Sequence, residues 1–352
     1  MAQDPYPCSS VKGQDRGMNF LRGIIRAQGQ IFLQAGWGPA VFALAAMTVA
    51  SPWFVLAALA GAAVQAGCAL GLAGWDDARG LHRLREGGNR ARSRALGHDP
   101  ESSRVDAKAL ARNRTGTIPA EVDQGLHGFN GALTGCAAVL ACGPGIPAAL
   151  WTLAGSAVCA LIVWGAPKLS WPESLPLLTG PFCLVNSIAV AVAVPFERTP
   201  GAVVPLGSPV HDVLAGAMRG AHQVILGGSV LGGLLVLAGM FAAGWRAGVW
   251  AAAGTMVGTL VGIGQGPAAS GLLGYGALLV TVALGVAFPA RGSRILRIGV
   301  PILAAAVTVP LWWAITAVGV APYTWPFVLV TWTVLALRSR QWRAGEARHD
   351  ER

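Results

Sequence analysis

Charged side chains are scarce in this chain of 352 residues, and their scarcity limits the kinds of protein it can be. Asp, Glu, Lys and Arg make up 12% of the sequence, about half of the fraction in an ordinary soluble domain. The charges lie mainly in residues 1–26, 76–123 and 338–352, and the stretches between them are rich in Ala, Val, Leu and Gly. One soluble core cannot hide so many uncharged stretches, so we expect the chain to be solvated by lipid.

The chain also lacks the residue clusters that metal sites and membrane-embedded enzymes need. Its six cysteines form no CxxC pair and are expected to be small core residues, and its six histidines show no metal-ligand spacing. An enzyme such as a prenyltransferase needs clustered carboxylates, usually with Mg²⁺, and Asp76–Asp77 is the one candidate cluster. We therefore expect no catalytic residue, no metal and no cofactor, and a membrane-embedded enzyme stays a remote alternative.

Long apolar runs predict an all-α polytopic membrane protein. A helix needs about 20 apolar residues to cross the hydrocarbon core. The chain shows no short strands of alternating polarity, which excludes a barrel and favours helices. The pattern predicts about ten transmembrane spans, at 30–50, 53–74, 125–142, 147–166, 175–197, 219–243, 246–266, 271–289, 298–317 and 322–338.

The positions of the basic residues predict the orientation in the membrane. A net charge of +10 would suit nucleic acid, but the basic residues lie in loops and tails, where the positive-inside rule explains them. With the N-terminal segment 1–25 in the cytoplasm, the basic loop 76–123 and the tail 339–352 are cytoplasmic too, whereas the loops 143–146 and 267–270 on the other side carry no charge. We expect a multi-pass protein of the inner (plasma) membrane with both termini cytoplasmic and no nucleic-acid partner.

The sequence contains an internal repeat. Residues Arg26–Leu33 match Arg219–Leu226, and Gly125–Phe129 match Gly271–Tyr275. The spacing between matched residues falls from the first pair to the second by about the length of the charged loop, so we interpret residues 76–123 as an insertion in the first repeat.

Each repeat contains an odd number of predicted spans. The first repeat is expected at 26–200 and the second at 219–338, with a linker at 201–218. An odd number makes the second repeat insert with opposite topology, as in transporters whose solute path lies between inverted repeats and uses broken or re-entrant helices. The pattern therefore predicts a central pore.

Two glutamines stand at matched positions inside apolar runs, Gln30 and Gln223. An unpaired amide in an apolar medium costs roughly 2–7 kcal/mol, so each needs a partner. Either they form hydrogen bonds that hold the helix bundle together, or they line the pore.

Two aromatic–leucine pairs also repeat. Phe129 and Leu133 lie one helical turn apart after a Gly-Leu-x-Gly segment, and Tyr275 and Leu279 repeat that spacing. Such pairs form either core packing or the wall of a pore.

A third pair of segments combines prolines with a threonine, at 175–182 and 321–327. Prolines remove amide donors and leave carbonyls free, and Thr179 and Thr324 add a hydroxyl at the break. Irregular backbone at membrane depth is tolerated where it faces a cavity, so these segments are predicted to line the pore.

Together these segments resemble the urea transporter family, and a bacterial member of it. The resemblance rests on Gly-Leu-x-Gly-Phe-Asn-Gly-x-Leu at 125–133, Leu-Pro-x-x-Thr-x-Pro-Phe at 175–182, a second Thr-x-Pro-Phe followed by Trp332, and the glutamine near the start of each repeat. It covers the chain except its termini and the loop 76–123.

The resemblance implies a homotrimer in which each protomer has its own pore. In the narrow slot, apolar side chains would contact the faces of planar urea and oxygen atoms would accept its N–H bonds. Its site residues, carried over, are Thr179 and Thr324 as acceptors, Gln30 and Gln223 at the two ends, Phe129, Leu133, Tyr275 and Leu279 as walls, and Leu33 and Leu226 as outer clamps. The function implied is passive permeation of urea down its gradient.

Several residues depart from the family's pattern. Leu33 and Leu226 stand where phenylalanines are common, Gln223 where a glutamate is frequent, and Gly276 where an asparagine is usual, and Pro322 is offset by one residue. The slot is therefore expected to be wider or less selective. A channel for ammonia, water or another small amide stays open as an alternative, as does a membrane subunit with a closed pore.

Overall fold

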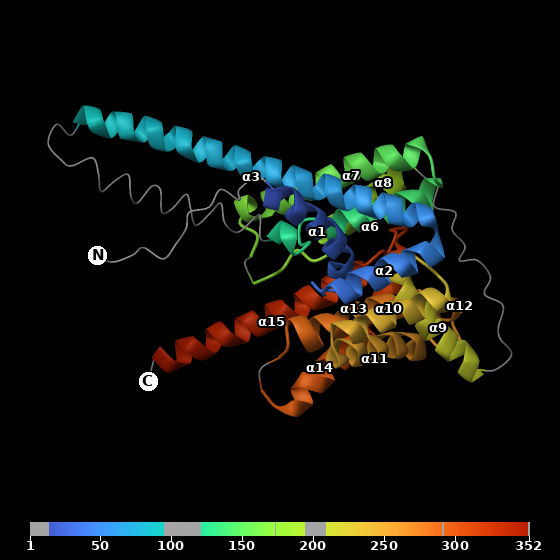
Figure 1. Ribbon diagram of the computed structural model, residues 1–352. Coiled ribbons are helices and arrows are strands. Elements are labelled where there is room, and N and C mark those ends of the chain that lie inside the picture. The colour runs from blue at the N-terminus through green and yellow to red at the C-terminus, as the bar shows by residue number, and fades with distance from the viewer. Residues whose placement is uncertain (1–13, 95–120, 173, 194–208, 291, 351–352) are drawn as a thin grey trace, which may run out of the picture.

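Every regular element in the described part of the chain is a helix, which confirms the predicted all-α class. Figure 1 shows these helices from the N-terminal ones in blue to the C-terminal one in red. We call residues 14–193 the first half and residues 209–350 the second half. The structure is a computed structural model, and it describes residues 14–94, 121–172, 174–193, 209–290 and 292–350.

The two halves contain similar series of helices. The helices of the first half are α1 (Gln14–Gln30), α2 (Trp37–Ala50), α3 (Pro52–Arg94), α6 (Phe129–Cys142), α7 (Ile146–Gly165), the 3₁₀-helix η1 (Ala166–Leu169) and α8 (Gly180–Ala193). Those of the second half are α9 (Pro209–Gln223), α10 (Val230–Ala243), α11 (Trp245–Val261), α12 (Gly266–Ala269), α13 (Gly274–Val282), the π-helix η2 (Ala283–Ala287), α14 (Arg294–Ala317) and α15 (Trp325–Asp350).

Among the described helices, three are long and apolar enough to cross a membrane, at Pro52–Asp76, Ile146–Leu169 and Arg294–Ala317. The other apolar helices, such as α2, α6, α8 and α10, have 10–17 residues. That is less than the roughly 20 residues of a complete crossing. The short helix α6 packs against two of the long ones, α3 and α7.

The helices of the two halves pack in the same arrangement. α6 lies against α1, α3, α7 and α8, and α13 lies against α9, α11, α14 and α15. The halves meet where α2 packs against α10 and α8 packs against α15 (Figure 1). Each of these four helices therefore touches the helix that occupies the same place in the other half.

Small residues allow the central helices to approach their neighbours closely. A Cβ on Gly61 of α3 would lie 2.0 Å from the carbonyl oxygen of Gly131 in α6. A Cβ on Gly254 of α11 would lie 2.6 Å from the carbonyl oxygen of Ala277 in α13. Backbones in such direct contact are typical of helix pairs in membranes.

The predicted span 219–243 is wrong as a single helix, because it contains the end of α9 and all of α10, and the predicted span 30–50 begins at the last residue of α1, before the break that precedes α2. The first helix ends at its glutamine, and the leucine three residues later, Leu33 or Leu226, has a φ of 59° or 63°. Its amide and the next one bond back to the helix carbonyls in the pattern of a Schellman motif. Leucine in this left-handed conformation costs about 1–2 kcal/mol. Hydropathy missed the breaks because apolar residues continue through them.

Several helices also extend beyond the predicted boundaries. α1 begins at Gln14, inside the expected N-terminal segment 1–25, and α9 begins at Pro209, inside the expected linker 201–218. Both helices carry polar residues on one face, so the hydropathy of the sequence did not indicate them. Ile24 is buried, so α1 is part of the packed bundle.

The charged loop and the C-terminal tail are partly helical. α3 continues to Arg94, within the expected loop 76–123, and residues 95–120 lie outside the described part. α15 likewise continues to Asp350 through most of the expected tail. No proline occurs between residues 53 and 99, and lengthening a formed helix is easier than starting one, which explains the extension of α3.

Candidate functional site

The two threonines predicted as acceptors meet at the contact between the halves. Thr179 precedes α8 and Thr324 precedes α15, and their Oγ1 atoms are 2.6 Å apart. Each is buried, with 3% of its surface exposed. The residues before them, Leu178 and Tyr323, have φ values of 52° and 32°. Matched segments of the two halves thus deliver one hydroxyl each to the same point.

A cysteine that sequence reasoning assigned to the core also reaches this point. The Sγ atom of Cys183 lies 3.0 Å from Oγ1 of Thr324, and Cys183 is fully buried. It lies one helical turn after Thr179 on α8, so the two side chains share a helix face. The four-residue spacing between Thr179 and Cys183 was the sequence pattern that could have indicated Cys183 as a site residue. The matched residue of α15 is Val328, so the sulfur is present in one half only.

Side chains bond the carbonyls that the first proline segment leaves free. Asn130 donates its side-chain amide to Leu178 O at 3.3 Å, and Trp332 donates its indole N–H to Pro176 O at 2.7 Å. The Oδ1 of Asn130 also accepts the backbone N–H of Phe182 at 3.1 Å. A carbonyl oxygen has two lone pairs, so each bonded carbonyl keeps one further acceptor position.

In the second half, a different side chain bonds the carbonyl of the residue before the threonine. Gly276 occupies the position that Asn130 has in the first half. The hydroxyl of Tyr275 instead donates a hydrogen bond to the carbonyl oxygen of Tyr323. Tyr323 in turn packs edge-on against Phe182, with ring centroids 5.1 Å apart. Asn130 and Tyr323 were absent from the predicted site residues, although both belong to its motifs.

The four predicted wall residues lie on the central helix of each half. Phe129 and Leu133 come from α6, and Tyr275 and Leu279 come from α13. All four are buried in one continuous apolar core that includes residues of both halves. The hydroxyl of Tyr275 connects this core to the segment before Thr324.

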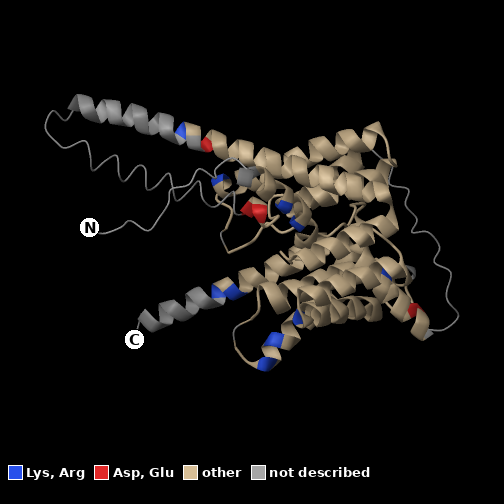
Figure 2. Ribbon diagram, in the orientation of Figure 1, with Lys and Arg blue, Asp and Glu red and all other residues tan. Residues whose placement is uncertain are grey.

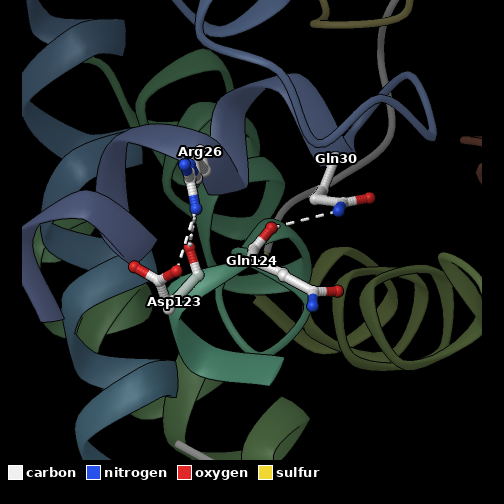
Figure 3. A network of polar contacts seen from close by, with 4 residues as sticks. All are labelled: Arg26, Gln30, Asp123 and Gln124. Atoms are coloured by element: carbon white, nitrogen blue, oxygen red, sulfur yellow. Dashed lines mark hydrogen bonds and ion pairs between the residues drawn. The ribbon is translucent and has the colours of Figure 1, made fainter. Parts of the chain in front are cut away.

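Gln30 is the last residue of α1 and Gln223 is the last residue of α9, and each donates a side-chain hydrogen bond to a backbone carbonyl elsewhere in its half. Gln30 donates Nε2–H to Gln124 O at 3.0 Å, and Gln223 donates Nε2–H to Ser270 O at 3.4 Å. Both side-chain amide nitrogens therefore form hydrogen bonds within the helix bundle. Figure 3 shows that the amide oxygen of Gln30 points away from Gln124.

One helical turn before each glutamine, an arginine bonds the residue next to the one that the glutamine bonds. Arg26 contacts both the carboxylate of Asp123, at 2.9 Å, and its backbone carbonyl, at 3.3 Å (Figure 3). Arg219 donates to Ala269 O at 2.9 Å. Leu33 and Leu226, which follow the glutamines, are partly buried against the core. The backbone amides of these two leucines bond to Gln30 O and Gln223 O, within their own helix ends.

The chain matches the family model described as urea transporter over residues 1–79 and 106–339. The chain belongs to the urea transporter family. No curated protein matches it significantly. Of the residues outside the match, 80–105 lie within the predicted insertion 76–123, and 340–352 lie in the expected tail. Membership confirms the resemblance seen in the motifs, the membrane location of the apolar helices and urea transport as the function.

The centre of this urea transporter is polar but carries no charge. The two threonine hydroxyls contact each other, and that of Thr324 contacts the thiol of Cys183; beside them, the side-chain amide of Asn130 bonds the carbonyl of Leu178. Figure 2 shows Lys and Arg residues at the start of α14 and along α15, and none of the buried polar side chains among the described residues is a Lys, Arg, Asp or Glu. Among the described residues, no group of three or more His, Cys, Asp and Glu could hold a metal ion. The site therefore suits a neutral polar solute.

Proposed function

We propose that urea crosses the protomer between the two halves, past the hydroxyls of Thr179 and Thr324, as passive flow down its gradient. The direct contact of these hydroxyls, at 2.6 Å, carries the proposal. A hydroxyl has one hydrogen and two lone pairs, so each threonine can exchange its bond to the other for an N–H of urea. The exchange leaves few polar groups unsatisfied, which keeps the barrier low.

The surroundings of the pair favour urea over ions. The N–H groups of urea lie in one plane, and a row of neutral acceptors between apolar walls fits that shape. A monovalent cation would lose its hydration shell there, and neutral oxygens in a narrow slot replace that shell poorly. The walls of the slot in this proposal are Phe129, Leu133, Tyr275 and Leu279.

The two ends of the path follow from the tethered helix ends. We assign Gln30 with Leu33 to one end and Gln223 with Leu226 to the other. Each glutamine lies at the end of a helix whose break turns the chain. The amide oxygen of Gln30, directed away from its backbone partner, is free to accept an N–H of urea as the solute enters.

The halves are proposed to be inverted repeats related by a pseudo-two-fold axis. A two-fold axis makes equivalent elements touch each other. The contacts of α2 with α10, of α8 with α15 and of Thr179 with Thr324 are of this kind. The first repeat then begins at α1 and the second at α9, so both begin earlier than the boundaries 26 and 219.

The assembly and orientation are part of the proposal. We propose a homotrimer with one pore in each protomer, in the inner membrane, with both termini cytoplasmic. The basic residues of α14 and α15 lie toward the end from which α3 and α15 project (Figure 2), as the positive-inside rule requires of a cytoplasmic side. The family is a family of transporters, and we assign no catalytic residue.

Stopped-flow light scattering on proteoliposomes in a urea gradient tests the pore. Thr179→Val with Thr324→Val removes two acceptors worth about 0.5–1.5 kcal/mol each, so urea permeability should fall about tenfold. The matched control is Thr48→Val with Thr333→Val, because these exposed threonines bond only their own helix, at 2.9 and 2.8 Å. Unchanged flux in the Thr179/Thr324 variant would reject this path.

Parallel gradients of other solutes test the selectivity. Acetamide, formamide, ammonia and water are measured in the same vesicles. Faster flux of ammonia or water than of urea, with equal sensitivity to the threonine substitutions, would favour the alternative substrates.

A further inference from the structure

A second site lies in the second half, apart from the threonine pair. A cavity of about 530 Å³ opens between the start of α11, the start of α14 and the π-helix η2. Its walls include Trp245, Trp250 and Ile298. None of its lining residues belongs to the site around Thr179 and Thr324.

Specific contacts hold the wall of the cavity next to α13. A Cβ on Gly285 would lie 2.6 Å from the indole ring of Trp250, so glycine lets this ring lie flat against η2. The hydroxyl of Thr281 donates to Trp250 O at 2.7 Å and ties α11 to α13. The indole therefore packs against η2 at Gly285, and the backbone of the same residue is bonded to α13.

Three arginines line the same cavity: Arg246 at the start of α11, and Arg294 and Arg297 at the start of α14. All three are exposed, and among the described residues none has a carboxylate within ion-pair distance. Figure 2 shows the basic residues at the start of α14. Three arginines without a carboxylate partner, beside walls that are mostly apolar, suit an anion that carries an apolar chain.

We propose that this cavity binds one anionic phospholipid. The guanidinium groups hold the phosphate through paired N–H bonds, which arginine provides better than lysine. The two tryptophans lie at the level of the headgroup, where indole rings are favoured. One acyl chain runs over Val249 and Ile298, which are half-exposed at the edge of the cavity.

A free phosphate ion would use only part of this surface. The walls between the arginines are apolar side chains, and burying them against lipid removes that area from water. Basic pockets between membrane helices are known receptors for anionic headgroups. The apolar walls therefore decide between the two sources of phosphate in favour of lipid.

Native mass spectrometry of the full-length protein with added phosphatidylglycerol or phosphatidylcholine tests the proposal. The wild type should retain phosphatidylglycerol preferentially. The triple variant Arg246→Gln, Arg294→Gln and Arg297→Gln should lose about fivefold in affinity for each guanidinium removed. The charge-matched control replaces Arg22, Arg79 and Arg340, which are exposed outside the cavity, by Gln and should bind as the wild type does.

A second variant tests the apolar part separately. Val249→Trp fills the edge of the cavity without changing the charge, and it should lower retention of phosphatidylglycerol with unchanged urea flux. Equal loss in the control triple variant would reduce the effect to general charge attraction and overturn the proposal. Displacement of the lipid by inorganic phosphate, or a changed number of protomers in the triple variant, would also overturn it, in favour of a free-anion site or a subunit interface.

Discussion

The two halves of this urea transporter share a backbone design but satisfy it with different side chains. Both contain a left-handed leucine after the first helix, and Gly125 and Gly271 adopt the same positive φ, of 80° and 85°. Yet Asn130 supports the break before α8 with two hydrogen bonds, whereas Tyr275 supports the break before α15 with one. The helix breaks therefore occur in both halves, whereas the side chains that bond their polar groups differ.

The largest expected effect tests the shared design. Gly61→Leu and Gly254→Leu force a side chain into backbone of the adjacent helix, 2.0 and 2.6 Å from the Cβ position. Overpacking costs about 1–3 kcal/mol in ordinary cores and more against backbone. We expect both variants to lose most folded protein, measured by size-exclusion chromatography and thermal unfolding in detergent. Gly67→Ala, with nothing within 4 Å, is the control. Tolerance of one leucine but not the other would show that the halves pack differently.

The second prediction tests the different supports. Asn130→Ala leaves the Phe182 amide and the Leu178 carbonyl without their partner, at about 1–3 kcal/mol for each buried group. Tyr275→Phe removes a single donor and should cost about half as much. Thermal unfolding and urea flux should fall in the order wild type, Tyr275→Phe, Asn130→Ala. The reverse order would mean that the second break carries the greater load.

The third prediction exchanges a feature between the halves. A Cβ on Gly276 would have its nearest neighbours at 3.7 Å, so a larger residue fits. Gly276→Ala should stabilise the protein by about 0.5–1 kcal/mol, because glycine inside a helix is unfavourable. Gly276→Asn should add an acceptor near the Phe327 amide and reduce flux of acetamide relative to urea. Destabilisation by alanine would contradict the space that the structure shows.

The last prediction compares the two glutamines. Gln30 is buried and bonds at 3.0 Å, whereas Gln223 is partly exposed and bonds at 3.4 Å. Gln30→Leu should therefore lower stability by about 0.5–1.5 kcal/mol, and Gln223→Leu by less. Thermal unfolding compares the two, and flux measured in the same samples reports the entrance role. Equal shifts in stability would show that burial does not distinguish these ends.

Much of the fold and part of the site could be predicted from local patterns. The helical class follows from hydropathy, and the choice of Thr179 and Thr324 as matched site residues follows from the repeated proline motifs. The role of Asn130 could not be predicted, because its partners, Leu178 and Phe182, are distant in the chain. The breaks after Gln30 and Gln223 were missed because the apolar pattern runs through them and their left-handed residue is leucine instead of glycine.

The sequence by itself determined that this protein lies in lipid, that it is helical and that matched motifs recur, because hydrophobicity, proline and repetition are written locally along the chain. Only the tertiary structure decided that equivalent helices touch across the two halves and bring two hydroxyls within 2.6 Å. It also decided that an arginine of α11 and two arginines of α14 line one apolar cavity. Such contacts depend on how the helices pack in three dimensions, and no local pattern of residues records that.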